Sequence, residues 1–263
     1  MVTRMPFADV NGQHLYFEDS GGDGPPVIFS HGFLMDHEMF APQVAGLCDT
    51  FRCITWDERG FGQTPATAPF DYYDSAADCL AILEHLGIER AVLAGMSQGG
   101  FLSLRAVLTA ADRVKALVLI DTQAGVEDAA TLPLYQAMHD EWIANGPANV
   151  QDAVAGLILG GGYDPSPWIA KWNAAPREGL TLPFRTLVER DDITGRLGEI
   201  LCPAIIFHGD ADQSIPMADA EVLRDNLKGC EKLVVVKGAA HASNMSHADQ
   251  VNGPLREFLL AHA

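Results

Sequence analysis

A serine flanked by glycines stands within residues 95–100, which read GMSQGG. An apolar run at 91–94 comes directly before this segment, and an apolar helical pattern follows it. A strand that turns this abruptly into a helix leaves the serine hydroxyl projecting above the sheet, and only small residues two before and two after it let the backbones pass. We therefore take Ser97 as the candidate nucleophile, with an ordinary glycine-rich turn as the alternative.

The candidate base is one of nine histidines, because a serine hydroxyl is a weak nucleophile until a neighbouring group accepts its proton. His241 follows the apolar run at 233–236 on a loop rich in glycine and alanine, at the sheet edge where we expect Ser97 to project. His31, in the sequence SHG, fits a structural role better, and His208 precedes a glycine at a strand end. We expect His241 to act as the general base.

A carboxylate is needed to orient the histidine and to stabilise its charged form. Residues 208–216 (HGDADQSIP) follow the apolar run at 204–207 and contain two aspartates. Asp210 is nearer the strand end, and we interpret it as a turn residue that hydrogen-bonds its own backbone. Asp212 lies further out on the loop and is the favoured acid. Asp121, at the end of the run 116–120, is a further alternative.

These residues need a sheet to bring them together, and seven short apolar runs are candidate strands. The inner runs are continuous in Val, Ile and Leu, as in parallel strands buried on both faces. Helical patterns alternate with them, for example Leu80, Leu83 and Leu86 closed by Gly87. This alternation predicts an α/β protein with a doubly wound, mostly parallel sheet. The runs are 15–19, 27–30, 52–56, 91–94, 116–120, 204–207 and 233–236.

The alternation stops between residues 123 and 200, where helical patterns are interrupted by glycines and prolines. We therefore expect a core formed by 1–122 and 201–263, with 123–200 inserted as a helical cap over the site. Three of the four tryptophans, Trp142, Trp168 and Trp172, lie in this cap. They either line the site or simply form the apolar core of the insertion.

The C-terminal segment has apolar residues at helical spacing, interrupted by Gly253-Pro254. Proline removes a backbone donor and clashes with the preceding turn, so we expect a kink or a late helix start there.

Composition limits the classes of function. Lys plus Arg is 17 and Asp plus Glu is 35, which gives a formal charge of −18 and argues against nucleic-acid and anionic membrane partners. The apolar stretches are too short for a membrane span, and the N-terminus has no apolar core of a secretory signal. The five cysteines are scattered without CxxC spacing, which predicts free thiols in the cytoplasm and argues against a zinc site.

Taken together, Ser97, Asp212 and His241 in this chain order resemble the triad of the α/β-hydrolase fold superfamily. Residues 30–33 (SHGF) are similar to the loop that, in this family, follows the third strand. The resemblance implies an oxyanion hole formed by the backbone N–H groups of Phe33 and Gln98. It implies no metal and no cofactor.

Two further segments support the resemblance. Residues 56–62 (WDERGFG) resemble the structural D-x-R-G-x-G turn that follows the fourth strand of the family, and the G-x-x-D-x-x-x-P spacing of 209–216 resembles its acid loop. The latter spacing is the main reason for preferring Asp212. Within the superfamily, residues 238–244 (GAAHASN) and the overall size are most similar to the 3-oxoadipate enol-lactonase and cofactor-free haloperoxidase groups.

The resemblance implies a serine hydrolase that cleaves a small-molecule ester or lactone through an acyl-enzyme, and the aromatic cap favours an apolar or ring-bearing substrate. A C–C bond hydrolase, a perhydrolase and a non-catalytic ligand receptor remain alternatives. A dicarboxylate substrate would need a cationic anchor, and the overall negative charge would slow its approach. The chain is compatible with a monomer or a homo-oligomer. The unplaced cations of the cap are Lys171, Arg177, Arg185, Arg190 and Arg196.

Overall fold

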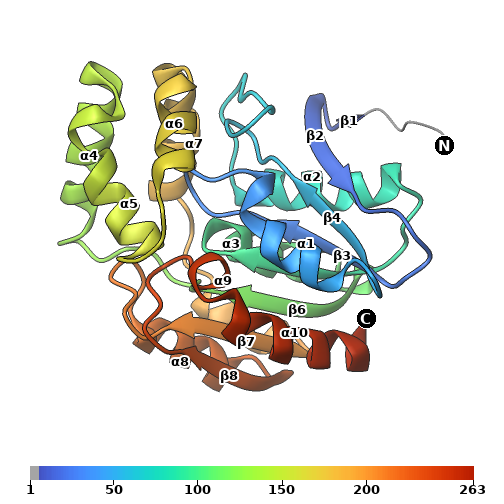
Figure 1. Ribbon diagram of the computed structural model, residues 1–263. Helices are drawn as coiled ribbons and strands as arrows, with labels where there is room; N and C mark the ends of the chain where they lie inside the picture. The colour runs from blue at the N-terminus through green and yellow to red at the C-terminus, as the bar shows by residue number, and fades with distance from the viewer. Residues whose placement is uncertain (1–5) are drawn as a thin grey trace.

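The computed structural model describes residues 6–263, which form a single eight-stranded sheet with helices on both faces (Figure 1). The strand order is β1-β2-β4-β3-β5-β6-β7-β8. All neighbours from β4 to β8 are parallel, and β1 and β2 are antiparallel additions at one edge. The strands are β1 (Phe7–Val10), β2 (Gln13–Asp19), β3 (Pro26–Ser30), β4 (Arg52–Trp56), β5 (Ala91–Met96), β6 (Val114–Ile120), β7 (Ala204–Gly209) and β8 (Cys230–Val236).

The predicted fold class is confirmed, and each of the seven predicted runs lies within an observed strand. Strand β1 was not among them. It pairs with β2 through a tight hairpin whose central residues, Asn11 and Gly12, have φ of 51° and 71°. Positive φ at both central positions defines the type I′ turn, for which Asn-Gly is the favoured pair. That dipeptide is the signal that identifies the hairpin in the sequence.

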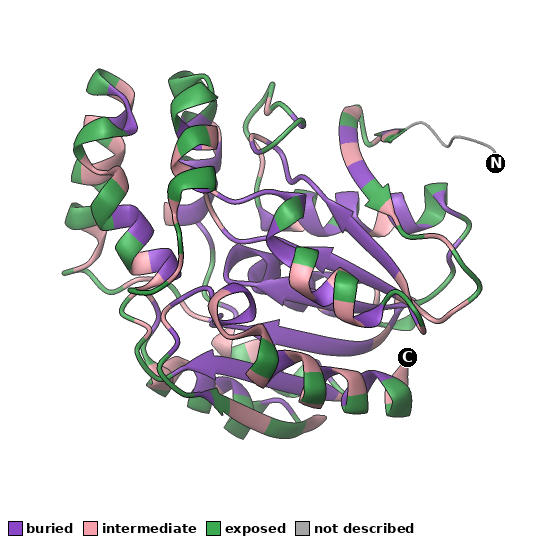
Figure 2. Cartoon of the chain, viewed as in Figure 1, coloured by how far each residue is buried: buried purple, intermediate pink, exposed green. Residues whose placement is uncertain are grey.

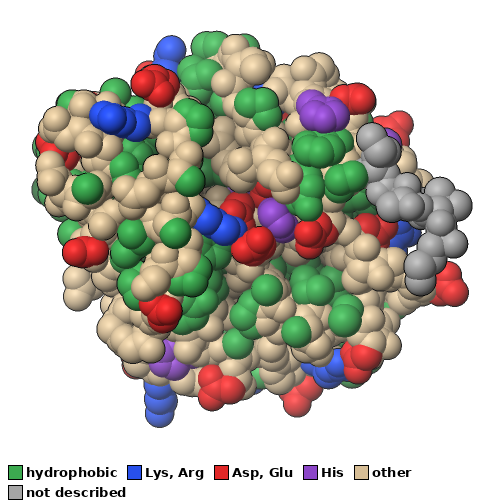
Figure 3. All heavy atoms as spheres, turned by 45° about the horizontal axis from the view of Figure 1, so that its top comes forward, with side chains coloured by type: hydrophobic (Ala, Val, Ile, Leu, Met, Phe, Trp, Pro, Cys, Tyr) green, Lys and Arg blue, Asp and Glu red, His purple; other side chains and the backbone are tan. Residues whose placement is uncertain are grey.

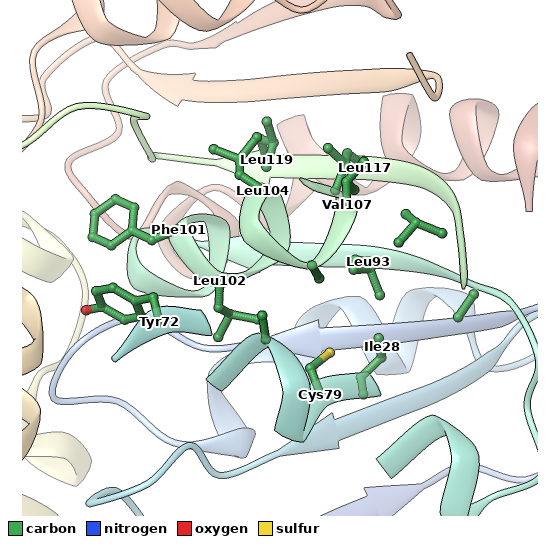
Figure 4. Close-up of a cluster of buried hydrophobic side chains, with 14 of the residues drawn as sticks. Ile28, Tyr72, Cys79, Leu93, Phe101, Leu102, Leu104, Val107, Leu117 and Leu119 are labelled. Carbon is green, nitrogen blue, oxygen red and sulfur yellow. The ribbon is translucent and has the colours of Figure 1, made fainter. Parts of the chain in front are cut away.

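Two layers of helices cover the sheet. Helices α2 (Tyr72–His85), α3 (Gln98–Thr109) and α8 (Met217–Asn226) share one apolar cluster with the sheet, and α1 (Ala41–Leu47) and α10 (Ala248–His262) share the other. Figure 4 shows part of the first cluster, in which Phe101, Leu102 and Leu104 of α3 pack with strand residues such as Leu93 and Leu117. Helix α2 ends at the predicted place, with Leu86 as its C-cap and Gly87 at φ 70°.

The C-terminal helix differs from the prediction. Helix α10 begins at Ala248 and continues through Pro254, so the expected late start is wrong. Because Pro254 lacks an N–H, the helix forgoes one backbone hydrogen bond in its second turn. The face made by Val251, Leu255 and Phe258 is buried against the sheet, and this burial outweighs the missing bond.

Residues 123–200, called the cap segment below, form four helices: α4 (Leu132–Asn145), α5 (Gln151–Leu159), α6 (Ser166–Ala174) and α7 (Thr181–Val188). They stand together at one side of the sheet, at the upper left of Figure 1. Short 3-10 turns join them, namely η3 (Pro147–Asn149) and η4 (Arg177–Leu180), with η5 (Thr194–Glu199) leading back to β7. Reading this segment as an inserted cap remains a prediction.

The remaining elements are η1 (His37–Phe40), η2 (Ala111–Arg113) and the short α9 (Ser243–Ser246). Among residues 6–263, every helix falls short of the length and apolar character that crossing a membrane requires. Acidic side chains are spread over the face shown in Figure 3, with fewer basic ones between them, in keeping with the net charge of −18.

Candidate active site

Ser97 is the single residue between β5 and α3, and its backbone is strained. Its φ is 51° and its ψ is −114°, a conformation that residues with a side chain rarely adopt and that clusters at functional sites. The turn is held on both sides, because Ser97 N donates to Ile120 O at 2.9 Å and Thr122 Oγ1 donates to Ser97 O at 2.7 Å. The backbone therefore presents the Ser97 side chain at the end of the sheet.

The two glycines that flank the serine are required by close backbone approach. A Cβ atom on Gly95 would lie 2.1 Å from Gly99 O, and one on Gly99 would lie 2.0 Å from Ser30 O. Both distances are far below contact, and in both cases the obstructing atom belongs to the backbone. The spacing of glycine around Ser97 is therefore a packing requirement of this strand–helix turn.

Three side chains from three different strand ends meet at this turn. His241 Nε2 lies 3.0 Å from Ser97 Oγ, and His241 Nδ1 lies 2.7 Å from Asp212 Oδ2. Ser97 and His241 are each 7% exposed, and the Asp212 side chain is fully buried. The structure thus places a hydroxyl, an imidazole and a carboxylate in one hydrogen-bonded line, as the sequence predicts.

The electrostatics of this line favour a charged His241–Asp212 pair. Burial alone would lower the pKa of His241, but the charge and hydrogen bond of Asp212 outweigh it and hold the pKa above its ordinary value. Burial likewise acts to raise the pKa of Asp212, yet the facing His241 keeps it below the usual range. An imidazole that is stabilised when protonated suits a group that must take a proton from a hydroxyl.

The loop after β7 separates the two aspartates that competed in the sequence. Asp212 Oδ1 accepts hydrogen bonds from Ser214 N at 2.8 Å and Ile215 N at 3.1 Å, which leaves Oδ2 free to face His241. Asp210 is exposed, and its Oδ1 accepts from Gly238 N at 2.7 Å. The expectation that Asp210 hydrogen-bonds its own turn is therefore wrong. Asp212 accepts the hydrogen bonds of that turn, and Asp210 instead binds the loop that carries His241.

Asp121 binds both the loop that carries Asp212 and the loop that carries His241. Its side chain is fully buried, with Oδ1 accepting from Gly209 N at 2.8 Å and Oδ2 accepting from Ser243 N at 2.9 Å. Burial, together with the charge of Asp212, raises the pKa of Asp121 to about 6. Both of its oxygens are thus used by backbone N–H groups that flank the acid and histidine loops.

His208, which was considered in the sequence but not chosen as the base, is a buried neighbour of the site. Its Nε2 lies 2.9 Å from Ile215 O and 3.7 Å from Asp212 Oδ2, and its ring is fully buried. His208 therefore packs behind the acid loop. Its only signal in the sequence is its position directly before a glycine at the end of a strand.

The loop after β3 passes beside the nucleophile. A Cβ atom on Gly32 would lie 3.7 Å from Ser97 Cβ, so this backbone approaches the serine closely. Met35 N donates to Gly32 O at 3.1 Å, closing a turn with Phe33 and Leu34 at its centre. Leu34 has a φ of 65°, as a type II turn requires at this position, and a non-glycine residue in this region costs about 1–2 kcal/mol.

The same loop is fixed on its core side by His31. This ring is fully buried, with Nδ1 2.8 Å from Gly32 O and Nε2 accepting from Glu58 N at 3.0 Å. Burial lowers the pKa of His31, so the neutral ring bridges the loop and the turn after β4. Gln98 is the first residue of α3, next to Ser97. The oxyanion-donor role of the Phe33 and Gln98 N–H groups remains a prediction.

An apolar pocket of about 120 Å³ opens next to Ser97 and His241. The cap segment supplies much of its wall, including Met138, Trp142, Leu157, Leu180 and Phe184, and the core contributes residues such as Phe33, Met96 and Ile215. Residues of the segment 123–200 and residues near the strand ends thus line the same pocket, next to Ser97 and His241.

Among residues 6–263, the pocket lining includes Glu127 and His139 but no lysine or arginine. The candidate cations of the cap are engaged elsewhere. Arg190, for example, is buried behind the wall, where it pairs with Glu127 and lies 4.3 Å from the Phe101 ring centroid. The other partners are Asp36 for Lys171, Ala144 O for Arg177, Glu189 for Arg185 and Glu199 for Arg196.

Two groups in the described part of the chain have spacing compatible with a metal ion, Asp36-His37-Asp57 and Asp121-His208-Asp212. In each group, one buried carboxylate already accepts a backbone hydrogen bond on each of its two oxygens. Asp57 accepts from His37 N and Gln63 N, and Asp121 accepts from Gly209 N and Ser243 N. These donor sets therefore fit hydrogen-bonded networks better than a metal coordination shell.

Comparison with known proteins agrees with the fold. The sequence model of the alpha/beta hydrolase fold matches residues 25–248. The chain is 28% identical to a non-heme haloperoxidase of Rhodococcus erythropolis, over 97% of this chain and 99% of that protein. It is 26% identical to 3-oxoadipate enol-lactonase 1 of Acinetobacter baylyi, over 87% of this chain and 86% of that protein.

Solved structures give the same result. An enol-lactonase from Burkholderia xenovorans superposes with a TM-score of 0.89 at 26% identity, covering 97% of this chain and 100% of that one. A thermophilic esterase from Thermogutta terrifontis superposes with a TM-score of 0.86 at 27% identity, covering 97% of both chains. The resemblance inferred from the motifs, including the two narrower groups, is confirmed.

Proposed function

Because the chain belongs to the alpha/beta hydrolase fold family, we propose that it is a serine hydrolase that cleaves a carboxylic ester or lactone through an acyl-enzyme. The observation that carries this proposal is the line of Ser97 Oγ, His241 and Asp212, with separations of 3.0 and 2.7 Å. In this proposal Ser97 is the nucleophile, His241 the general base and Asp212 the acid that orients it.

The reaction proceeds in two steps, acylation of Ser97 and hydrolysis of the acyl-enzyme. Ser97 Oγ attacks the substrate carbonyl carbon while His241 Nε2 accepts its proton, and the Phe33 and Gln98 N–H groups hold the developing oxyanion. As the tetrahedral intermediate collapses, His241 returns the proton to the departing alcohol oxygen, which in a lactone stays attached through the ring. Water then attacks the acyl-enzyme with His241 again as base, releasing the acid and restoring Ser97.

The pocket supports an uncharged, apolar or ring-bearing substrate. Its wall is made largely of aliphatic and aromatic side chains, and it contains no lysine or arginine from residues 6–263. A substrate with a free carboxylate would have to bury that charge without a lysine or arginine partner, since the nearby Arg190 is already paired with Glu127, and this is unfavourable. The pocket therefore disfavours a dicarboxylate-type substrate for this chain, even though relatives include proteins named enol-lactonases.

A perhydrolase is the second candidate, favoured by the similarity to a non-heme haloperoxidase. In this alternative the same acyl-enzyme is resolved by hydrogen peroxide in place of water, giving a peracid. To test this alternative, the purified protein is incubated with acetate and hydrogen peroxide, and oxidation of a dye reports the peracid that forms. Peracid formation must depend on Ser97. Formation that Ser97→Ala leaves unchanged contradicts this alternative.

The setting proposed for this activity is the cytoplasm, with a small-molecule substrate and either a monomer or a homo-oligomer. All five cysteines are free thiols, which supports a reducing compartment.

The test of the hydrolase proposal is hydrolysis of p-nitrophenyl acetate and butyrate by the purified protein and by Ser97→Ala. We expect activity in the wild type and a fall of at least about 10⁴-fold in the variant. A fluorophosphonate probe should label the wild type alone. Ser103→Ala is the matched control, because its buried hydroxyl lies on α3 and donates only to Gly99 O at 2.6 Å. Turnover that survives Ser97→Ala removes Ser97 from the mechanism.

A further inference from the structure

The loop that carries Phe33 is bonded to the cap segment as well as to the core. Trp172, on cap helix α6, donates from Nε1 to Leu34 O at 2.7 Å, and it is only 4% exposed. One residue earlier, Lys171 Nζ lies 2.6 Å from Asp36 Oδ2 and 2.8 Å from Glu38 Oε2. Helix α6 thus contacts the stretch that begins directly after Phe33 at three points.

These contacts bear on a strained turn. Leu34 holds a φ of 65°, a conformation that glycine adopts freely and that a leucine leaves unless other contacts hold it. The Gly32 carbonyl is held from the core side by Met35 N and His31 Nδ1. On the cap side, the Leu34 carbonyl is held by the Trp172 indole. Phe33 lies between the two anchored carbonyls.

We propose that Trp172 is a positioning residue for the oxyanion hole: by fixing the Leu34 carbonyl, it keeps the strained turn closed and the Phe33 N–H directed at the reacting carbonyl. This inference rests on the proposed hydrolase function. Under it, docking of cap helix α6 and formation of the oxyanion hole are one event. The cap segment then contributes to the chemical step in addition to shaping the pocket.

The proposal predicts which kinetic constant changes. Hydrogen bonds to the oxyanion strengthen in the transition state, whereas the bound ester is held mainly by the apolar pocket. Trp172→Phe removes the N–H donor and retains an aromatic ring, while Lys171 still pairs with Asp36. We expect kcat for p-nitrophenyl butyrate to fall about ten-fold, the change equivalent to one net hydrogen bond, with KM within about two-fold.

A rescue experiment separates strain in the turn from other effects. In the Trp172→Phe background, Leu34→Gly removes the penalty for positive φ, and Leu34→Ala removes nearly the same side chain while keeping the Cβ that causes the penalty. We expect the glycine double variant to recover most of the lost kcat and the alanine double variant to recover little. Both substitutions shorten the same pocket-lining side chain, so the difference in kcat between the two double variants reports the strain of the backbone at position 34.

A second readout is binding of an alkylboronic acid, which forms a tetrahedral adduct with a nucleophilic serine and places an oxygen in the oxyanion hole. Its inhibition constant should weaken by the same factor as kcat in Trp172→Phe. Trp168→Phe is the matched control, because Trp168 lies on the same helix, is also buried and is absent from the pocket lining. Thermal unfolding of all variants, followed by circular dichroism, identifies those that fail to fold.

Three results would contradict the proposed role of Trp172. An unchanged kcat in folded Trp172→Phe, a rise in KM in place of a fall in kcat, or equal activity of the glycine and alanine double variants overturns the role of Trp172. If Trp172→Phe does not fold, Trp172→Met replaces it in the same comparison, because methionine also fills the space with an apolar side chain that has no N–H donor. Wild-type protein that fails to hydrolyse the ester, or that does so without Ser97, overturns the hydrolase proposal and this inference with it.

Discussion

The strand ends and the cap segment meet at one pocket but are built differently. Strands β3 to β7 are buried along nearly their whole length, whereas the cap helices are exposed on much of their surface (Figure 2). The candidate catalytic side chains are each fixed by hydrogen bonds from backbone groups or from one another, such as the two backbone donors on Asp212. The cap contributes apolar walls whose exact residue types matter less than their volume and position.

Under the proposed hydrolase function, this difference gives the two regions separate roles. The strand ends determine which bond chemistry is available, because that chemistry needs particular atoms at particular distances. In the same proposal, the cap segment determines which substrates can enter, because apolar contact depends on shape. The two regions are nevertheless bonded to each other, as Ala242 N donates to Ile158 O at 2.7 Å beside His241 and Trp172 donates to Leu34 O beside Phe33. The predictions below test how far the separation holds.

The largest effect is expected at the acid loop. Asp212→Asn places an amide against His241 Nδ1 and favours the wrong imidazole tautomer, so kcat should fall about 10⁴-fold. Asp210→Asn is the matched control, because its remaining amide oxygen can still accept the hydrogen bond from Gly238 N, and kcat should stay within about three-fold. Steady-state ester hydrolysis measures both. The reverse ranking shows that the wrong carboxylate was chosen.

A pair of glycines tests rigidity in the two regions. Gly99→Ala forces a Cβ to within 2.0 Å of Ser30 O and should lower the free energy of unfolding by about 3 kcal/mol. Gly156→Ala, in cap helix α5, meets nothing within 4 Å and should raise it by about 0.5–1 kcal/mol through helix propensity. Denaturant unfolding checks both. Equal effects at the two positions contradict the contrast between a close-packed turn and an open helix face.

The pH dependence should be governed by the strand ends alone. His241 must be neutral to accept the Ser97 proton, and Asp212 holds its pKa above the ordinary value. The kcat/KM of the wild type should therefore fall about ten-fold per pH unit below a midpoint above roughly 6.5. Asp212→Asn should move the residual midpoint to lower pH, because the charge that raises the pKa of His241 is removed. A flat profile between pH 5 and 8 argues against His241 as the base.

The smallest effect is expected in the cap wall. Leu157→Ala removes apolar contact from α5, and kcat/KM for p-nitrophenyl octanoate should fall about five-fold relative to acetate. Leu134→Ala is the control, because Leu134 is 57% exposed on α4 and does not line the pocket. The pH midpoint should be unchanged in both variants. A large loss with acetate as well shows that α5 positions the catalytic loops in addition to lining the pocket.

Much of the strand-end region could be predicted from the sequence, because its constraints are local. The glycines around Ser97 are required by backbone contacts within the turn, and the apolar runs are buried because they are parallel inner strands. Strand β1 was missed because a four-residue edge strand with mixed burial has little apolar pattern. The start of α10 was misjudged because tertiary burial of one face outweighs a single proline.

The sequence by itself determined the order of seven strands along the chain, the strained turn at Ser97 and the short set of histidines and aspartates that could serve as its partners. Only the tertiary structure decided that Asp212 faces His241 while Asp210 binds Gly238 and Asp121 joins the two loops. It also decided that a tryptophan far along the chain bonds to the turn at Leu34. The physical reason is that local rules act between neighbours in the chain, whereas these contacts arise from how separate elements pack, and packing distances of a few ångströms leave no trace in the residue pattern.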